Sequence, residues 1–225
     1  MRFFMANHQF TESEIATVYR VIAERRDMRH FLPTPVDPET LTRILQAAHQ
    51  APSVGLMQPW RFIRVSDSSI RNSIHQLVDE ERKLTAQAIG EYENTARMAE
   101  FLRLKVEGIL DCGELLVATL CNKREEHIFG RRTLPEMDIA SVSCAIQNMW
   151  LAARAEGLGM GWVSIFDPAK LGALLNIPTD AKPIAILCVG HVNTFYNEPM
   201  LIETGWRKAK PLADMVMENQ WSTHE

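Results

Sequence analysis

Apolar residues recur at helical spacing in four stretches of the chain, and three of these stretches open with clear start signals. Thr11, followed three residues later by Glu14, fits a capping box, and the pair Asp37-Pro38 places proline at the first helical position. Gly157 supplies a stop signal after the most apolar stretch. The pattern predicts helices from 11 to about 25, from 37 through 48, from about 138 to 156, and over a short stretch that Asp167-Pro168 opens.

Short apolar runs between these helices predict β-strands, at 60–65, 115–120, 160–166 and 184–189. The segment from 70 to about 109 is mostly helix-forming and highly charged, and we expect Gly90 and Gly108 to break it. No internal repeat and no Gly/Ser-rich linker interrupts the chain, which predicts a single domain over residues 1–225. Strands separated by helices and irregular loops indicate a mixed α/β architecture.

The C-terminal arm, residues 193–225, carries Trp206 and Trp221 beyond the last predicted strand. Large aromatic side chains in such an arm usually pack against protein surface, so we expect it to dock on its own subunit or on a partner subunit. Arg207 in this arm would be able to reach back to a bound anion, although a solvated charge is the simpler interpretation of that residue alone.

The composition is that of an ordinary globular protein, with 46% hydrophobic and 23% charged residues in a chain of 225. The formal net charge of -4 argues against a dedicated nucleic-acid-binding protein, which usually carries a basic excess. Residues 1–10 lack the long apolar run of a signal peptide, and no stretch approaches the ~20 apolar residues that a membrane span needs. We therefore expect a cytoplasmic protein without membrane attachment.

The cysteines and histidines show no metal-binding pattern. Four cysteines occur, at 112, 121, 144 and 188, the last between apolar neighbours and none in a Cys-x-x-Cys pair, and the seven histidines lack ligand spacing. These patterns predict no metal site and favour buried, reduced thiols. The sequence also lacks the glycine motifs of a Rossmann dinucleotide site or a P-loop, and the motif of a serine nucleophile.

A basic run after the first predicted helix is the first candidate site. It reads Arg25-Arg26-Asp27-Met28-Arg29. In an extended chain successive side chains alternate, so Arg25, Asp27 and Arg29 would share one side. Their forked guanidinium donors match phosphate oxygens, and they would hold the carboxylate of Asp27 ionised. The alternative is a solvated helix end, where basic residues favour the helix dipole.

Two loops rich in glycine or proline are further candidates. In the segment 51–60, Gly55 allows the backbone to approach a ligand closely and Ser53 offers a polar contact. In the segment 157–166, three alternate glycines leave space for a flat aromatic ligand, and Ser164 is a lone hydroxyl among apolar residues. The first segment is equally an ordinary helix-to-strand connection, and the second a helix C-cap that leads into a core strand.

Taken together, these motifs resemble those of the nitroreductase-like flavoprotein family. That family has an early Arg-x-Ser-x-Lys/Arg motif, then Ala-Pro-Ser near Gln-Pro-Trp, then a helix that ends in Gly-Leu-Gly, and a basic residue near the C-terminus. The matching segments are, in order, 25–29, 51–53, 58–60, 157–159 and Arg207. Asp27 replaces the family's usual serine, and Met57 replaces a usual polar residue. Both departures, together with residues 161–166, resemble the 5,6-dimethylbenzimidazole synthase branch.

The resemblance implies an α+β nitroreductase-like fold, with a mixed central sheet and helices on both sides, in an intertwined homodimer. FMN would lie at the dimer interface, under a lid formed by the segment 70–110, and the C-terminal arms would be exchanged between subunits. The phosphate would be gripped by Arg25, Arg26, Arg29 and Arg207. The remaining FMN-binding residues would be Asp27, Met28, Pro52, Ser53, Val54, Gly55, Gly161, Trp162 and Ser164.

The branch's reaction takes reduced FMN and molecular oxygen and releases 5,6-dimethylbenzimidazole, the lower ligand of vitamin B12, and erythrose 4-phosphate. A separate flavin reductase would supply the reduced FMN. Asp27 would act as general base at the ribityl chain, and Ser164 would hydrogen-bond the ring or its oxygen adduct.

Two alternatives stay open at this point. One is a conventional NAD(P)H-dependent nitroreductase or flavin reductase, in which FMN is a recycled cofactor. The other is a non-catalytic FMN-binding protein. Asp27 argues against the second alternative, because a pure phosphate binder gains nothing from an added negative charge.

Overall fold

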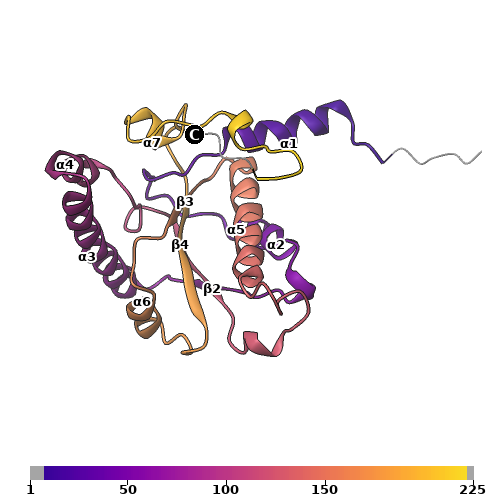
Figure 1. Cartoon of the computed structure of the whole chain (residues 1–225), viewed down its shortest axis with the longest axis horizontal. Coiled ribbons are helices and arrows are strands. Elements are labelled where there is room, and N and C mark those ends of the chain that lie inside the picture. Colours follow the sequence, from indigo (N-terminus) through magenta and orange to yellow (C-terminus); the bar gives the residue numbers. More distant parts are fainter. Residues whose placement is uncertain (1–7, 222–225) are drawn as a thin grey trace, which may run out of the picture.

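A four-stranded sheet in the order β1-β2-β4-β3 forms the centre of the protein (Figure 1). The computed structural model describes residues 8–221, so the expectation for the first ten residues lies mostly outside the described residues. All four predicted strands are present, and β3 ends before Ser164 rather than at Phe166. The strands are β1 (Trp60–Arg64), β2 (Glu114–Leu120), β3 (Gly159–Val163) and β4 (Lys182–Gly190).

The sheet differs from the mixed sheet that the family resemblance implied. Each pair of neighbouring strands is antiparallel. β2 and β3 run in the same direction and are joined through the helix α5 (Met137–Ala155), but β4 inserts between them, so they form no parallel ladder. Within residues 8–221, parallel pairing outside the named strands consists of one isolated bridge, between Asp27 and Met160.

Helices cover both faces of the sheet, as predicted for the α+β class (Figure 1). One face packs against α5 and α2, the other against α3 and α6, and α1 and α7 lie at one end of the sheet. The remaining helices are α1 (Glu12–Glu24), α2 (Pro38–His49), α3 (Ser68–Tyr92), α4 (Thr95–Arg103), α6 (Pro168–Leu174) and α7 (Met200–Glu203), with short 3-10 turns at Val54–Leu56, Arg124–Glu126 and Leu212–Asp214.

The central strand β2 connects two separate cores. Leu116, Ala118 and Leu120 pack with α2 and α5, whereas Leu115 and Val117 pack with α3 and α6. Every residue of β2 is buried, because helices lie on both faces of the sheet. This double burial explains why the segment is a nearly continuous apolar run instead of an alternating one.

Local signals set the helix ends where the sequence placed them. The hydroxyl of Thr11 accepts a hydrogen bond from the N–H of Glu14, whose carboxylate accepts one from the N–H of Thr11 at 2.8 Å, so the capping box is complete. Asp37 caps α2 through the N–H of Thr40 at 2.8 Å. Gly157 ends α5 with a φ of 77°, a conformation that favours glycine.

The long charged segment folds into two helices, but Gly90 does not break it. α3 continues through Gly90 to Tyr92, and α4 then begins at Thr95, after the N-cap residue Asn94, whose side chain accepts a hydrogen bond from the N–H of Arg97 at 2.9 Å. One glycine costs a helix about 1 kcal/mol, which a long helix tolerates, whereas an asparagine cap stabilises a new start. Gly108 lies outside both helices, as predicted.

The cysteine prediction is confirmed for three of the four residues. Cys112, Cys121 and Cys188 are buried and all four thiols are free, but Cys144 is exposed because it lies on the solvent side of α5. Within residues 8–221, no three His, Cys, Asp or Glu side chains are grouped to hold a metal ion. The same part of the chain contains no helix with the length and apolar character of a membrane span.

Candidate active site

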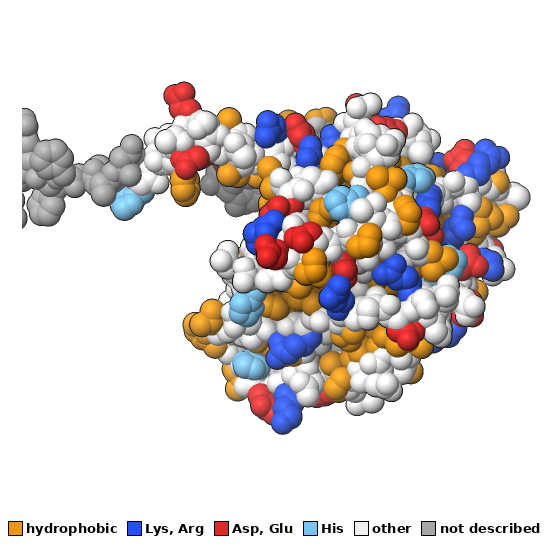
Figure 2. Space-filling view, turned by 180° about the vertical axis from the view of Figure 1, so that it is seen from behind, with side chains coloured by type: hydrophobic (Ala, Val, Ile, Leu, Met, Phe, Trp, Pro, Cys, Tyr) orange, Lys and Arg blue, Asp and Glu red, His pale blue; other side chains and the backbone are white. Residues whose placement is uncertain are grey.

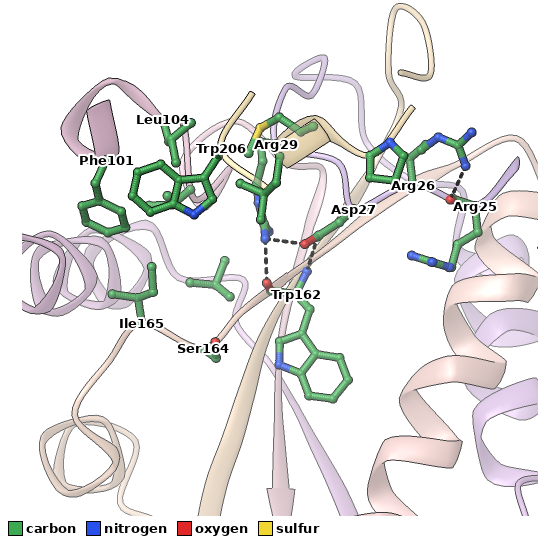
Figure 3. A pocket seen from close by; sticks show the side chains of 15 residues that line it. Arg25, Arg26, Asp27, Arg29, Phe101, Leu104, Trp162, Ser164, Ile165 and Trp206 are labelled. Carbon is green, nitrogen blue, oxygen red and sulfur yellow. Dashed lines mark hydrogen bonds and ion pairs between the residues drawn. The ribbon is translucent and has the colours of Figure 1, made fainter. Parts of the chain in front are cut away.

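A cavity of about 360 Å³ lies beside the end of β3 (Figure 3). Four segments that are distant in the sequence meet around it: the segment after α1, the end of β3, the end of α4 with the loop behind it, and residues 195–206, which we call the strap. The cavity is lined by Arg25, Arg26, Asp27, Arg29, Phe101, Leu104, Val106, Trp162, Val163, Ser164, Ile165, Pro199, Met200, Leu201 and Trp206.

The segment 25–29 reaches the cavity because it lies against β3. The N–H of Met28 donates to the carbonyl of Met160 at 2.9 Å, and the Met28 side chain is fully buried. Gly161 permits this approach, because a Cβ there would fall far inside contact distance of the Met28 carbonyl oxygen and 2.9 Å from Nη1 of Arg29. The segment therefore turns Met28 into the core and its two neighbours toward the cavity, the alternation that an extended chain predicts.

Asp27 lies on the polar side of the cavity. Its Oδ2 accepts from Nη2 of Arg29 at 2.6 Å, and its Oδ1 accepts from the N–H of Trp162 at 3.0 Å (Figure 3). Burial raises the pKa of Asp27, and Arg29, the Trp162 N–H and Arg25 offset this only in part. The side chain is packed on one side and opens into the cavity on the other, where 43% of it stays exposed. The arginines favour the ionised carboxylate, as the sequence predicted, whereas partial burial disfavours it.

The three arginines point in different directions (Figure 3). Arg29 is nearly buried and also donates to a main-chain carbonyl of β3 at 2.8 Å, but its Nε and Nη1 have no partner among the described residues. Arg26 donates to the carbonyl of Asn197 at 2.6 Å, and its Nε is buried without a described partner. Arg25 stacks over the ring of Trp150 at 4.8 Å. Buried donors without acceptors are the chemistry of an anion site.

The opposite wall of the cavity is apolar and aromatic, and the sequence did not reveal it. Trp206 of the strap packs beside Phe101 of α4 with ring centroids 6.0 Å apart, and Leu104 and Ile165 extend the wall (Figure 3). No periodicity links two segments so far apart in the chain. The available signal was a large aromatic residue in a C-terminal arm.

Two further predicted residues, Trp162 and Ser164, line the cavity together with the segment 25–29. Ser164 is exposed and follows directly after the last residue of β3. Arg207 is exposed next to Trp206 and does not line the cavity; its N–H donates to the carbonyl of a strap residue. Gly161 lies beneath the segment 25–29 rather than in the wall.

The predicted loop 52–55 lies apart from the cavity of its own chain. The hydroxyl of Ser53 accepts from the N–H of Gln58 at 3.0 Å, and the N–H of Val54 donates to a hydroxyl of α5 at 3.0 Å. Gly55 has a φ of 53° and packs tightly against Phe129. These bonds fix the loop on the surface, beside exposed apolar side chains.

Comparison with known proteins assigns the family. A sequence profile described as the Nitroreductase family matches residues 22–191. The chain belongs to the nitroreductase family. Within this family, the 5,6-dimethylbenzimidazole synthase of Rhodospirillum rubrum is 40% identical over 189 residues, which are 83% of this chain and 87% of the relative.

Solved structures of other nitroreductase-like proteins share the fold. The BluB-like flavoprotein from Clostridium difficile 630 superposes with a TM-score of 0.69 at 16% identity, over 90% of this nitroreductase-family chain and 99% of the other. Oxidized iodotyrosine deiodinase bound to FMN and 3-iodo-L-tyrosine gives 0.69 at 21% identity, over 91% and 100%. At such identities the likeness concerns the fold.

Proposed function

We propose that this protein converts reduced FMN and molecular oxygen into 5,6-dimethylbenzimidazole and erythrose 4-phosphate, with a separate flavin reductase supplying the reduced FMN. The Rhodospirillum rubrum relative, 40% identical over most of both chains, supports the product by its name. The observation that carries the proposal is the carboxylate of Asp27, set among arginines on the cavity wall. A site that only held an anion would be weakened by that charge.

The residues around the cavity fit a flavin phosphate. Nε and Nη1 of Arg29 and Nε of Arg26 are buried donors that lack acceptors in the described structure, and phosphate oxygens would supply acceptors. The rings of Trp206 and Phe101 offer an apolar surface on the opposite side, suited to a flat ring system. FMN would then bind with its phosphate at the arginines and its ring at the aromatic wall.

The protein's own groups would position the substrate and move a proton. Bound reduced FMN would supply the electrons that oxygen takes up. Asp27 would accept a proton from the ribityl carbon next to the ring. This carbon stays with the ring nitrogens in 5,6-dimethylbenzimidazole, and the carbon–carbon bond beyond it breaks to release the four-carbon erythrose 4-phosphate. A raised pKa suits this role, because a base works best when its pKa lies nearer the working pH. Ser164 would hydrogen-bond the ring, and the aromatic wall would exclude water.

Replacement of Asp27 by asparagine tests the proposal. Reduced FMN is incubated with the protein in air, and the products are separated by chromatography. We expect 5,6-dimethylbenzimidazole from the native protein, and a loss of about 100-fold or more in Asp27→Asn with FMN binding retained. Full turnover in Asp27→Asn would remove this residue from the mechanism. Intact FMN with steady NAD(P)H oxidation by the native protein would identify a conventional reductase, and tight binding with neither activity a non-catalytic binder.

We also propose that the active form is a homodimer. α1 has no buried residue and projects from the body in both overall views (Figures 1 and 2), with Val18 and Tyr19 more than half exposed. Beside the loop 52–55, Leu56 and Phe129 are 79% and 83% exposed. Apolar surface of this kind is typically covered by another protein surface. In a dimer, the loop 52–55 of one subunit would reach the cavity of the other.

A matched pair of surface substitutions tests the dimer. Phe129→Asp places a charge beside the loop 52–55, whereas Tyr92→Asp changes a side chain of similar exposure at the end of α3. We expect light scattering to report a dimer for the native protein and for Tyr92→Asp. Phe129→Asp should dissociate and lose affinity for FMN. A native monomer that binds FMN fully would refute the proposal.

A further inference from the structure

We propose that Arg97 is a positioning residue that latches α4 onto the strap through Trp206, and that this latch keeps the FMN cavity closed. The identity of the occupant rests on the function proposed above, but the latch itself rests on contacts within the chain. Through this latch, α4 and the strap would together cover the cavity.

Trp206 is held by three contacts from α4. The guanidinium carbon of Arg97 lies 3.4 Å from the centroid of the Trp206 ring, a close cation–π contact. Nη2 of Arg97 also donates to the carbonyl of Trp206 at 2.6 Å. Phe101, one helical turn further along α4, packs against the same indole with a centroid distance of 6.0 Å. Ring and backbone of Trp206 are therefore both fixed to α4.

The guanidinium of Arg97 is itself held in place by its own helix. Nη1 lies 2.7 Å from a carboxylate oxygen of Glu100, and Nε lies 3.4 Å from one of Glu93. Only 19% of the Arg97 side chain is exposed. Glu100 lies in α4, and Glu93 lies two residues before its first residue. These two carboxylates therefore orient the guanidinium on α4, where it contacts Trp206 of the strap.

The strap crosses the cavity between two anchored ends. At its start, Arg26 donates to the carbonyl of Asn197 at 2.6 Å, and the hydroxyl of Tyr196 lies 2.7 Å from Nδ1 of His30. At its other end stands Trp206. Trp206 lines the cavity and Arg97 does not, so Arg97 holds this wall from outside. Loss of the Arg97 contact would free one end of the strap while the sheet and the anion side stay intact.

Release of FMN measures the latch directly. Arg97→Gln removes the cation and most of the forked donor, and we expect oxidised FMN to dissociate about tenfold faster, with greater quenching of bound-flavin fluorescence by iodide. Arg97→Lys keeps the charge without the planar fork, and its FMN dissociation rate should lie between those of the native protein and Arg97→Gln. Arg103→Gln is the matched control, since Arg103 belongs to the same helix, is exposed, and has a side chain that makes no polar contact within the described residues.

Hydrogen exchange in the protein without FMN separates the latch from the proposed function. We expect Arg97→Gln to accelerate exchange both in α4 and in residues 199–206, and Arg103→Gln to leave both segments unchanged. Release and exchange rates equal to those of Arg103→Gln would overturn the latch, as would faster exchange confined to α4. If native protein fails to bind FMN, the proposed function falls, and the exchange result still decides whether the latch exists.

Discussion

Gly161 is the position at which one added methyl group should damage the site most. The residue lies in β3, paired with Cys188 of β4, and the segment 25–29 crosses directly over it. In Gly161→Ala the new Cβ would meet the carbonyl oxygen of Met28, a backbone atom that side-chain rotation cannot move away. The segment would have to lift off the edge of β3.

The cost of that displacement can be assembled from the contacts that it breaks. The Met28–Met160 backbone hydrogen bond is worth about 1 kcal/mol, and the bond from the Trp162 N–H to the Asp27 carboxylate about 1.5–3 kcal/mol. Keeping these bonds would instead incur overpacking strain of about 1–3 kcal/mol. Because strain and bond loss partly replace one another, we expect the free energy of unfolding to fall by roughly 2–5 kcal/mol.

Urea denaturation of Gly161→Ala and of a matched control gives the measurement. Gly172 lies in α6 with nothing within 4 Å of its added Cβ, so Gly172→Ala should be neutral or stabilise by up to about 1 kcal/mol. FMN affinity should fall in Gly161→Ala and stay unchanged in Gly172→Ala. Equal unfolding free energies for the two variants would refute the reasoning, because they would show that the segment 25–29 has room above β3.

Three further results are expected. Asp138→Ala should lower the free energy of unfolding by about 3–5 kcal/mol in urea denaturation, since it leaves Arg131, 5% exposed, without its buried carboxylate; a loss below 1 kcal/mol would contradict this. Burial raises the pKa of Asp27 above its ordinary value of 3.8, so the folded state binds this proton more tightly than the unfolded state. The free energy of unfolding should therefore fall as pH rises through the acidic range between the unfolded-state and folded-state pKa values of this carboxyl group. Asp27→Asn should flatten this fall, and identical pH profiles of unfolding free energy for the two proteins would exclude this contribution. A thiol reagent should modify Cys144 rapidly in the native protein and the other cysteines only after unfolding, as peptide mapping would show.

Local signals in the sequence determined the helix ends and most of the strand positions. The capping box at Thr11, the Asp-Pro starts of α2 and α6, and Gly157 each act through atoms a few residues apart, so neighbouring residue types suffice to predict them. The alternation after α1 likewise placed Asp27 and Arg29 on one side. The family motifs also predicted the α+β class and several cavity residues, because the motifs occur in this chain in the same order as in the family.

Tertiary structure alone decided how these pieces meet. The insertion of β4 between β2 and β3 makes the sheet antiparallel, and no local pattern encodes which strands become neighbours. The burial that raises the pKa of Asp27 comes from segments far along the chain. The contact of Arg97 with Trp206 joins α4 to the C-terminal strap. In the sequence Arg97 is an ordinary helix charge, and Trp206 indicated that the arm docks but not on which segment. Such contacts arise only when the folded core brings distant segments together, because their free energy depends on burial and geometry that neighbouring residues do not determine.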